Sequence, residues 1–160
     1  MQVAWIASRQ KADRRERVEY LVDTNVLVYA LDAGDPTRRK RARDWLTFLV
    51  EQENGALSTQ ALTELANVCL SRLNPPWEPS VVNAHLRDLS LTFDVLPVTT
   101  SVVSEALRGV QDHQMSFLDA QMWAVAKLYQ LPYLLTEDMA TGATIEGVMI
   151  IDPFSLAPPA

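Results

Sequence analysis

The sequence is poor in the residues that build several common kinds of functional site. It has one cysteine, Cys69, which excludes an intramolecular disulfide and fits a reducing compartment. Its two histidines, His85 and His113, stand alone, with no histidine or cysteine at zinc-ligand spacing, which disfavours a zinc site. Its 5 glycines form no glycine-rich phosphate loop, and no G-x-S-x-G motif marks a serine nucleophile.

Long apolar runs are also missing. No stretch approaches the ~20 residues that a membrane helix needs, and the apolar residues 3–6 are too few for the core of a signal peptide. Together with the lone cysteine, these absences predict a cytoplasmic protein with no membrane association. The 160 residues, 48% hydrophobic and 21% charged, suffice for one globular domain with a sizeable core.

The net charge of −6 is unevenly distributed along the chain. Residues 1–43 hold ten of the fourteen Lys and Arg and six of the twenty acids, whereas residues 44–160 hold four bases and fourteen acids. This division is expected if the early part meets a polyanion and the later part gathers carboxylates around a positive group. A chance distribution remains the alternative.

Short apolar stretches alternate with longer amphipathic ones. The short stretches predict strands, and the longer ones predict helices. This alternation indicates an α/β fold, in which helices flank a central parallel sheet. We expect a basic arm over residues 1–18, one domain over 19–156 and a tail over 157–160. The predicted strands cover residues 19–23, 55–58, 93–99, 132–136 and 146–154, and the predicted helices cover 24–32, 36–54, 59–73, 81–90, 101–113 and 116–130.

Two acidic residues directly follow predicted strands. Asp23 ends the first strand, and Asp138 lies just after the strand at 132–136. In a parallel sheet the carboxyl ends of the strands share one edge, where ligands bind. Both residues also have a structural interpretation, since Asp23 can cap the following helix and Asp138 can form an Asx turn. Glu137, next to Asp138, is an alternative functional acid.

Two more acids lie on predicted helices. Asp119 belongs to a mostly apolar helix, where a buried carboxylate needs a hydrogen-bonding partner or a metal. The spacing Ser116-x-x-Asp119 is also a capping box, so a structural role is equally open. Glu64 lies opposite the apolar stripe of its helix, and by itself it is interpreted as a solvated surface residue. Its helix nevertheless begins at the carboxyl edge of the sheet.

These four acids are therefore predicted to gather at one edge of the sheet. Clustered carboxylates repel one another and raise one another's pKa. A hard divalent cation such as Mg²⁺ or Mn²⁺ prefers oxygen ligands and removes that repulsion. The pattern thus predicts a metal site built from carboxylates.

The chain resembles the PIN-domain family, and within it the VapC-type toxin ribonucleases of bacterial toxin–antitoxin pairs. The resemblance covers residues 20–154 and rests on five segments in family order, which are more specific together than singly. The matching segments are VDTNVLVYALD at 22–32, LSTQALTELANV at 57–68, MSFLDAQMWAVA at 115–126, LLTEDMATG at 134–142 and VMIIDPF at 148–154.

The resemblance implies a PIN-like three-layer sandwich with an acidic pocket that holds Mg²⁺ or Mn²⁺. The family usually has an aromatic residue where this chain has Leu118, a departure that we expect to affect packing and not the metal ligands. The catalytic and metal-binding acids of the family map onto Asp23, Glu64, Asp119 and Asp138, and its polar supports map onto Asn25 and Thr136.

The activity that the resemblance implies is hydrolysis of RNA by a Mg²⁺- or Mn²⁺-dependent endoribonuclease, leaving 5′-phosphate and 3′-hydroxyl ends. The protein is then the toxin component of a type II toxin–antitoxin system, with RNA as substrate and with a small antitoxin and a second copy of itself as partners. We expect a basic antitoxin side chain to enter the acidic pocket, and an apolar antitoxin helix to lie against residues 45–50 or 81–89. Two alternatives stay open, a stand-alone PIN nuclease in RNA processing and a non-catalytic antitoxin-binding repressor partner.

A basic run, RRKRAR at 38–43, places five bases among six residues. We predict that Arg38, Arg39 and Arg41 contact RNA phosphates. The structural alternative is a solvated helix face, which often carries such a run.

Overall fold

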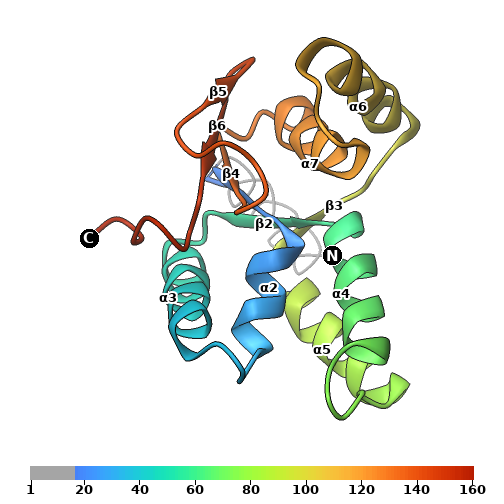
Figure 1. Cartoon of the computed structure of the whole chain (residues 1–160), viewed down its shortest axis with the longest axis vertical. Coiled ribbons are helices and arrows are strands. Elements are labelled where there is room, and N and C mark those ends of the chain that lie inside the picture. Colours follow the sequence, from blue (N-terminus) through green and yellow to red (C-terminus); the bar gives the residue numbers. More distant parts are fainter. Residues whose placement is uncertain (1–16) are drawn as a thin grey trace, which may run out of the picture.

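The computed structural model describes residues 17–160, so all but the last two residues of the expected basic arm lie outside the described part of the chain. Figure 1 shows a central sheet with helices on both faces. The strands are β1 (Tyr20–Val22), β2 (Gly55–Ser58), β3 (Asp94–Leu96), β4 (Tyr133–Leu135), β5 (Thr144–Ile145) and β6 (Val148–Ile151). The helices are α2 (Thr24–Leu31), α3 (Pro36–Gln52), α4 (Thr59–Ser71), α5 (Pro79–Thr92), α6 (Thr100–His113) and α7 (Phe117–Leu128).

The sheet has the strand order β3-β2-β1-β4-β6-β5. The chain first moves outward from β1 through β2 to β3, and then crosses back to β4 on the other side of β1. Because crossovers between parallel strands are right-handed, the two directions place α2–α5 on one face and α6 and α7 on the other. Figure 1 shows these two helical layers. The predicted α/β sandwich with its central parallel sheet is confirmed.

The last part of the sheet differs from the prediction of one strand over 146–154. Strand β5 pairs antiparallel with β6, and Glu146 and Gly147 form the two-residue turn between them. Both turn residues have left-handed backbone angles, with φ 47° and 88°. A turn of two left-handed residues matches the twist of a β-hairpin, which explains the additional strand.

The apolar face of α3 packs into the core of the chain itself. Trp45 and Leu49 are 2% and 1% exposed, and the Trp45 indole donates a hydrogen bond to the carbonyl oxygen of Leu156 (2.9 Å). Trp45 and Leu49 therefore offer no surface to a partner helix, whereas docking on residues 45–50 stays a prediction, since Val50 is 44% exposed. No helix in residues 17–160 combines the length and apolar composition of a membrane span.

Helices α6 and α7 pack closely because a glycine faces a buried tryptophan. A β-carbon on Gly109 would lie 2.8 Å from the Trp123 ring, which is 0% exposed. The indole of Trp123 also donates a hydrogen bond to the carbonyl oxygen of Ile145 (3.0 Å). This ring therefore ties α7 both to α6 and to the hairpin of β5 and β6.

The substitution Gly109→Ala is expected to lower the free energy of unfolding by roughly 1–3 kcal/mol, because the buried ring cannot move away from the added methyl group. Chemical denaturation measures this change. An exposed position of the same helix supplies the control, since Ser104→Ala is expected to leave stability unchanged or raise it slightly. Stabilisation by Gly109→Ala, as at an ordinary helical glycine, would contradict the packing described here.

Candidate metal centre

Asp23 lies at the point where β1 ends and α2 begins. One carboxylate oxygen accepts a hydrogen bond from the backbone N–H of Thr24 (2.6 Å), so Asp23 caps α2. The other oxygen accepts from the hydroxyl of Thr136 (2.7 Å). The residue is 7% exposed. Burial raises the pKa of Asp23 to about 6, against the lowering effect of these two hydrogen bonds, and the nearby charges of Asp138 and Glu64 raise it further.

Asp138 approaches Asp23 because β4 runs beside β1. The backbone N–H of Asp138 donates to the hydroxyl oxygen of Thr136 (3.1 Å), and this bond fixes the turn after the strand. The Asn25 amide nitrogen lies 3.0 Å from a carboxylate oxygen of Asp138 and 3.4 Å from one of Asp23. Asn25 and Thr136 thus orient the two carboxylates, which is the position expected of polar supports.

Asp119 reaches the same place from the first turn of α7. Ser116 caps this helix, accepting from the backbone N–H of Asp119 (3.3 Å) and donating to its carboxylate (2.6 Å). The interior of α7 is buried as predicted, but Asp119 itself is only partly buried because the first turn is open to solvent. Asp23, and not Asp119, is therefore the buried carboxylate that needs a hydrogen-bonding partner or a metal.

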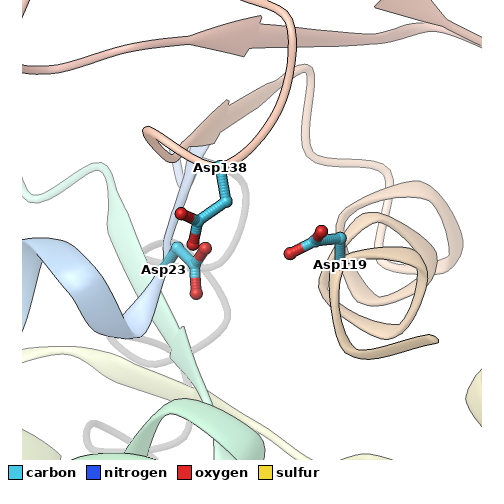
Figure 2. A group of neighbouring side chains, drawn as sticks. All are labelled: Asp23, Asp119 and Asp138. Atoms are coloured by element: carbon cyan, nitrogen blue, oxygen red, sulfur yellow. The ribbon is translucent and has the colours of Figure 1, made fainter. Parts of the chain in front are cut away.

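The structure brings three of the four predicted acids together. Asp23, Asp119 and Asp138 each offer a carboxylate oxygen, and these oxygens lie within 4.8 Å of one another. Figure 2 shows the three side chains pointing into a common space between the end of β1, the loop after β4 and the start of α7. None of the three forms a salt bridge with another residue of 17–160. Three oxygen donors without a counter-charge, one of them buried, fit a hard divalent cation.

Glu64 lies beside this cluster and not within it. It is partly buried on α4 and accepts a hydrogen bond from the Gln60 amide (2.8 Å). Its charge is nevertheless close enough to raise the pKa of Asp23.

Glu137 points away from the cluster, which rules out its use as the alternative to Asp138 in this arrangement. Its carboxylate forms a salt bridge with Arg38 of α3 (2.5 Å). The same guanidinium donates to the hydroxyl of Tyr29 (2.6 Å) and lies over the ring of Phe154. Arg38, predicted to contact RNA, is thus already held by this chain. No local sequence pattern predicts this contact, since Arg38 and Glu137 lie 99 positions apart.

The position of Leu118 differs from the expectation that its departure from the family pattern affects packing. Its side chain is 54% exposed, next to Asp119, so the departure from the aromatic residue of the family does not concern packing. Sequence patterns treat an apolar residue on an apolar helix as part of the core. They fail here because the first turn of α7 extends beyond the core.

The match to a family model identifies the class of protein to which this fold and site belong. The model for the PIN domain matches residues 20–140, and the chain belongs to the PIN domain family. A search of curated proteins finds no match.

Solved structures share the fold. VapC20 of Mycobacterium tuberculosis, described as a sarcin-ricin loop cleaving toxin, is 23% identical with a TM-score of 0.61, covering 80% of this chain and 98% of that one. FitAB, solved bound to a DNA fragment, is 23% identical with a TM-score of 0.64, covering 87% and 98%. The DNA-bound VapBC of Salmonella typhimurium is 16% identical with a TM-score of 0.60, covering 85% and 98%.

The raised pKa of Asp23 predicts a pH dependence of stability without metal. Between pH 3.8, the ordinary pKa of an aspartate, and a pH of about 6, the folded protein holds a proton on Asp23, whereas the unfolded chain has lost it. Stability therefore falls as pH rises through this window, by about 3 kcal/mol for the full shift. Asp23→Asn keeps an N-cap side chain and should abolish this fall, which makes the metal-free variant the more stable protein at pH 8.

The measurement is the free energy of unfolding against pH in the presence of a chelator. The difference between wild type and Asp23→Asn removes the contributions of other acids, among them Glu105 and Glu146, whose pKa values are lowered to about 2 by Arg108. The exposed variant Glu51→Gln should reproduce the wild-type profile. A constant difference between wild type and Asp23→Asn from pH 4 to 8 would contradict the buried, proton-binding carboxylate.

Proposed function

We propose that the protein is a Mg²⁺- or Mn²⁺-dependent endoribonuclease and the toxin component of a type II toxin–antitoxin system. The observation that carries this proposal is the cluster of Asp23, Asp119 and Asp138, three carboxylates from three separate elements within 4.8 Å on a PIN domain. Structural carboxylates normally pair with a base or face open water, whereas these converge on one another.

In the proposed site, Asp23, Asp119 and Asp138 hold the cation, and Glu64 completes the pocket or holds a second ion. When bound there, the cation would lower the pKa of a water molecule and offset the charge that develops on the phosphate. The chain keeps the carboxylates in place, since Thr136 and Asn25 donate to Asp23 and Asn25 also donates to Asp138. Hydrolysis of the phosphodiester then leaves 5′-phosphate and 3′-hydroxyl ends.

The toxin assignment is supported by the proteins that share the fold. One is described as a sarcin-ricin loop cleaving toxin, and another was solved as a toxin–antitoxin complex from Klebsiella pneumoniae. The latter is 20% identical, with a TM-score of 0.57. The exposed carboxylate of Asp138 leaves the cluster accessible to a basic side chain of an antitoxin. The three clustered acids, with Glu64 beside them, argue against a non-catalytic repressor partner. We place the protein in the cytoplasm, where RNA is its substrate.

A second copy of the chain is a further proposed partner. Val103, Leu107 and Val110 form an apolar stripe on the outer side of α6 and are 37%, 57% and 36% exposed. Such a stripe on a surface helix supports a homodimer, in which the same faces meet.

Replacing each clustered acid by its amide tests the proposed activity. Asp23→Asn, Asp119→Asn and Asp138→Asn should each lower RNA cleavage at least about 100-fold, because each removes a charge that holds the cation. End-labelled RNA with Mg²⁺ or Mn²⁺ measures cleavage, and calorimetric titration with Mn²⁺ measures cation binding. Glu51→Gln, an exposed site on α3, controls for the charge change alone. Wild-type cleavage by the three variants would refute the proposal.

The basic run on α3 generates a separate prediction about RNA binding. Because Arg38 is held by Glu137, the informative variant is Arg39→Gln with Arg41→Gln. Loss of two phosphate contacts should reduce the slope of log affinity against log salt by about 1.4. Binding is measured on the Asp119→Asn background, so that the RNA stays intact. The exposed Arg87→Gln on α5 serves as the charge control, and a slope equal to that of this control would remove the basic run from the RNA-binding surface.

A further inference from the structure

A groove of about 360 Å³ lies between the first turns of α4 and the start of α7. Its size is at the lower end of the range for small-ligand sites, which suits one ring system and excludes a duplex. It is lined by Thr59, Gln60, Thr63, Glu64, Val98, Leu118 and Gln121.

The groove adjoins the acidic cluster at two points. Glu64 lines the groove, and its charge acts on Asp23 of the cluster. Leu118 lines it as well and directly precedes Asp119 on α7. A molecule in the groove therefore lies beside the carboxylates that we propose to hold the cation.

Two amide side chains give the groove fixed hydrogen-bonding groups. Gln60 is 8% exposed, and its amide nitrogen donates to Glu64 (2.8 Å) and to the carbonyl oxygen of Leu118 (3.2 Å). Its carbonyl oxygen accepts from the amide of Gln121 (2.7 Å). The bond orients Gln121, whose carbonyl oxygen and second N–H have no hydrogen-bond partner in the part of the chain that the structure describes. One donor and one acceptor at fixed positions match the edge of a nucleobase.

The groove also offers an apolar surface that the core does not use. Leu118 is 54% exposed on a helix whose interior is buried, and Val98 faces it from the segment after β3. The flat face of an unpaired base gains most from such a surface. Among the residues that the structure describes, Glu64 is the only charged side chain that lines the groove, and its negative charge disfavours a phosphate there but not a neutral base.

We propose that this groove binds one unstacked nucleobase of the RNA next to the bond that is cleaved. Leu118 contacts the face of the base, and Gln121 forms hydrogen bonds with its edge. The inference rests on the proposed ribonuclease function and adds a source of base preference to it.

Binding is tested first, without reliance on cleavage. The four nucleoside 5′-monophosphates are titrated with Mg²⁺ into isotope-labelled full-length protein, and NMR follows the Gln121 side-chain amide and the Leu118 methyl groups. We expect saturable shifts at both, of different size for the four bases. The exposed Leu91 and Gln111, on α5 and α6, should not respond. Shifts with N-acetyl-arginine amide but with no nucleotide would assign the groove to a protein side chain and overturn the proposal.

Base preference is tested next with a randomised RNA pool whose products are sequenced. Leu118→Ala and Gln121→Ala should each weaken the preference beside the cleaved bond about fivefold to tenfold, the effect of one lost contact. Leu91→Ala and Gln111→Ala should preserve it. Cleavage with unchanged preference in all four variants, and no nucleotide shifts, would overturn the groove and leave the ribonuclease intact. Nucleotide shifts without any cleavage would overturn the ribonuclease and keep the base site, and the absence of both would overturn both.

Discussion

The parallel pairing of β1 with β4 is the constraint on which the acidic site depends. Val22 pairs with Leu135, so the next residues along the two strands, Asp23 and Thr136, leave the sheet side by side. The chain moves away from these strands in opposite directions, toward β2 and toward β6. Such a reversal opens a crevice at the carboxyl ends of the strands, with no connection crossing it. The crevice lets Asp138 and the first turn of α7 reach Asp23 from two sides (Figure 2).

The positive side chain next to Asp138 is committed to another acid. Arg38 pairs with Glu137, one residue before Asp138. On the other face of the sheet, at the end of α7 that lies away from Asp119, Arg108 and Lys127 pair with Glu105 and also bind Glu146. These pairs stabilise the α3, α6 and α7 contacts, and no base of residues 17–160 forms a salt bridge with the cluster. A buried carboxylate in that situation depends on hydrogen-bond donors, here Thr24 and Thr136, and on whatever cation enters from solvent.

Strand ends and topology made two of the clustered acids, Asp23 and Asp138, predictable from sequence, because the carboxyl ends of parallel strands must share an edge. Asp119 was predicted from its apolar helix, although the side chain itself is only partly buried. The choice between Glu137 and Asp138 was not predictable, since adjacent residues after a strand point in different directions. The salt bridge with Arg38, which holds Glu137 outside the cluster, is visible only in the structure. The capping of α7 by Ser116 was predictable from spacing, whereas the exposure of Leu118 was not, because periodicity does not reveal where the core stops along a helix. The hairpin turn at Glu146 also lacked a signal, since glutamate seldom has a left-handed backbone.

The charges of the clustered carboxylates also determine the order in which the cation and the RNA bind at the proposed site. A phosphate approaching Asp23, Asp119 and Asp138 without a cation meets three negative charges within 4.8 Å of one another, with Glu64 beside them. Repulsion at such distances is large wherever water is partly excluded. In the proposed ribonuclease, the cation would therefore bind before or together with the RNA, and the affinity for RNA would depend on the concentration of the cation. In the groove beside Leu118, the charge of Glu64 does not repel a neutral base, so a base can occupy the groove whether or not the cation is bound. Phosphate binding and base binding are thereby separated, the first controlled by charge and the second by shape and hydrogen bonds.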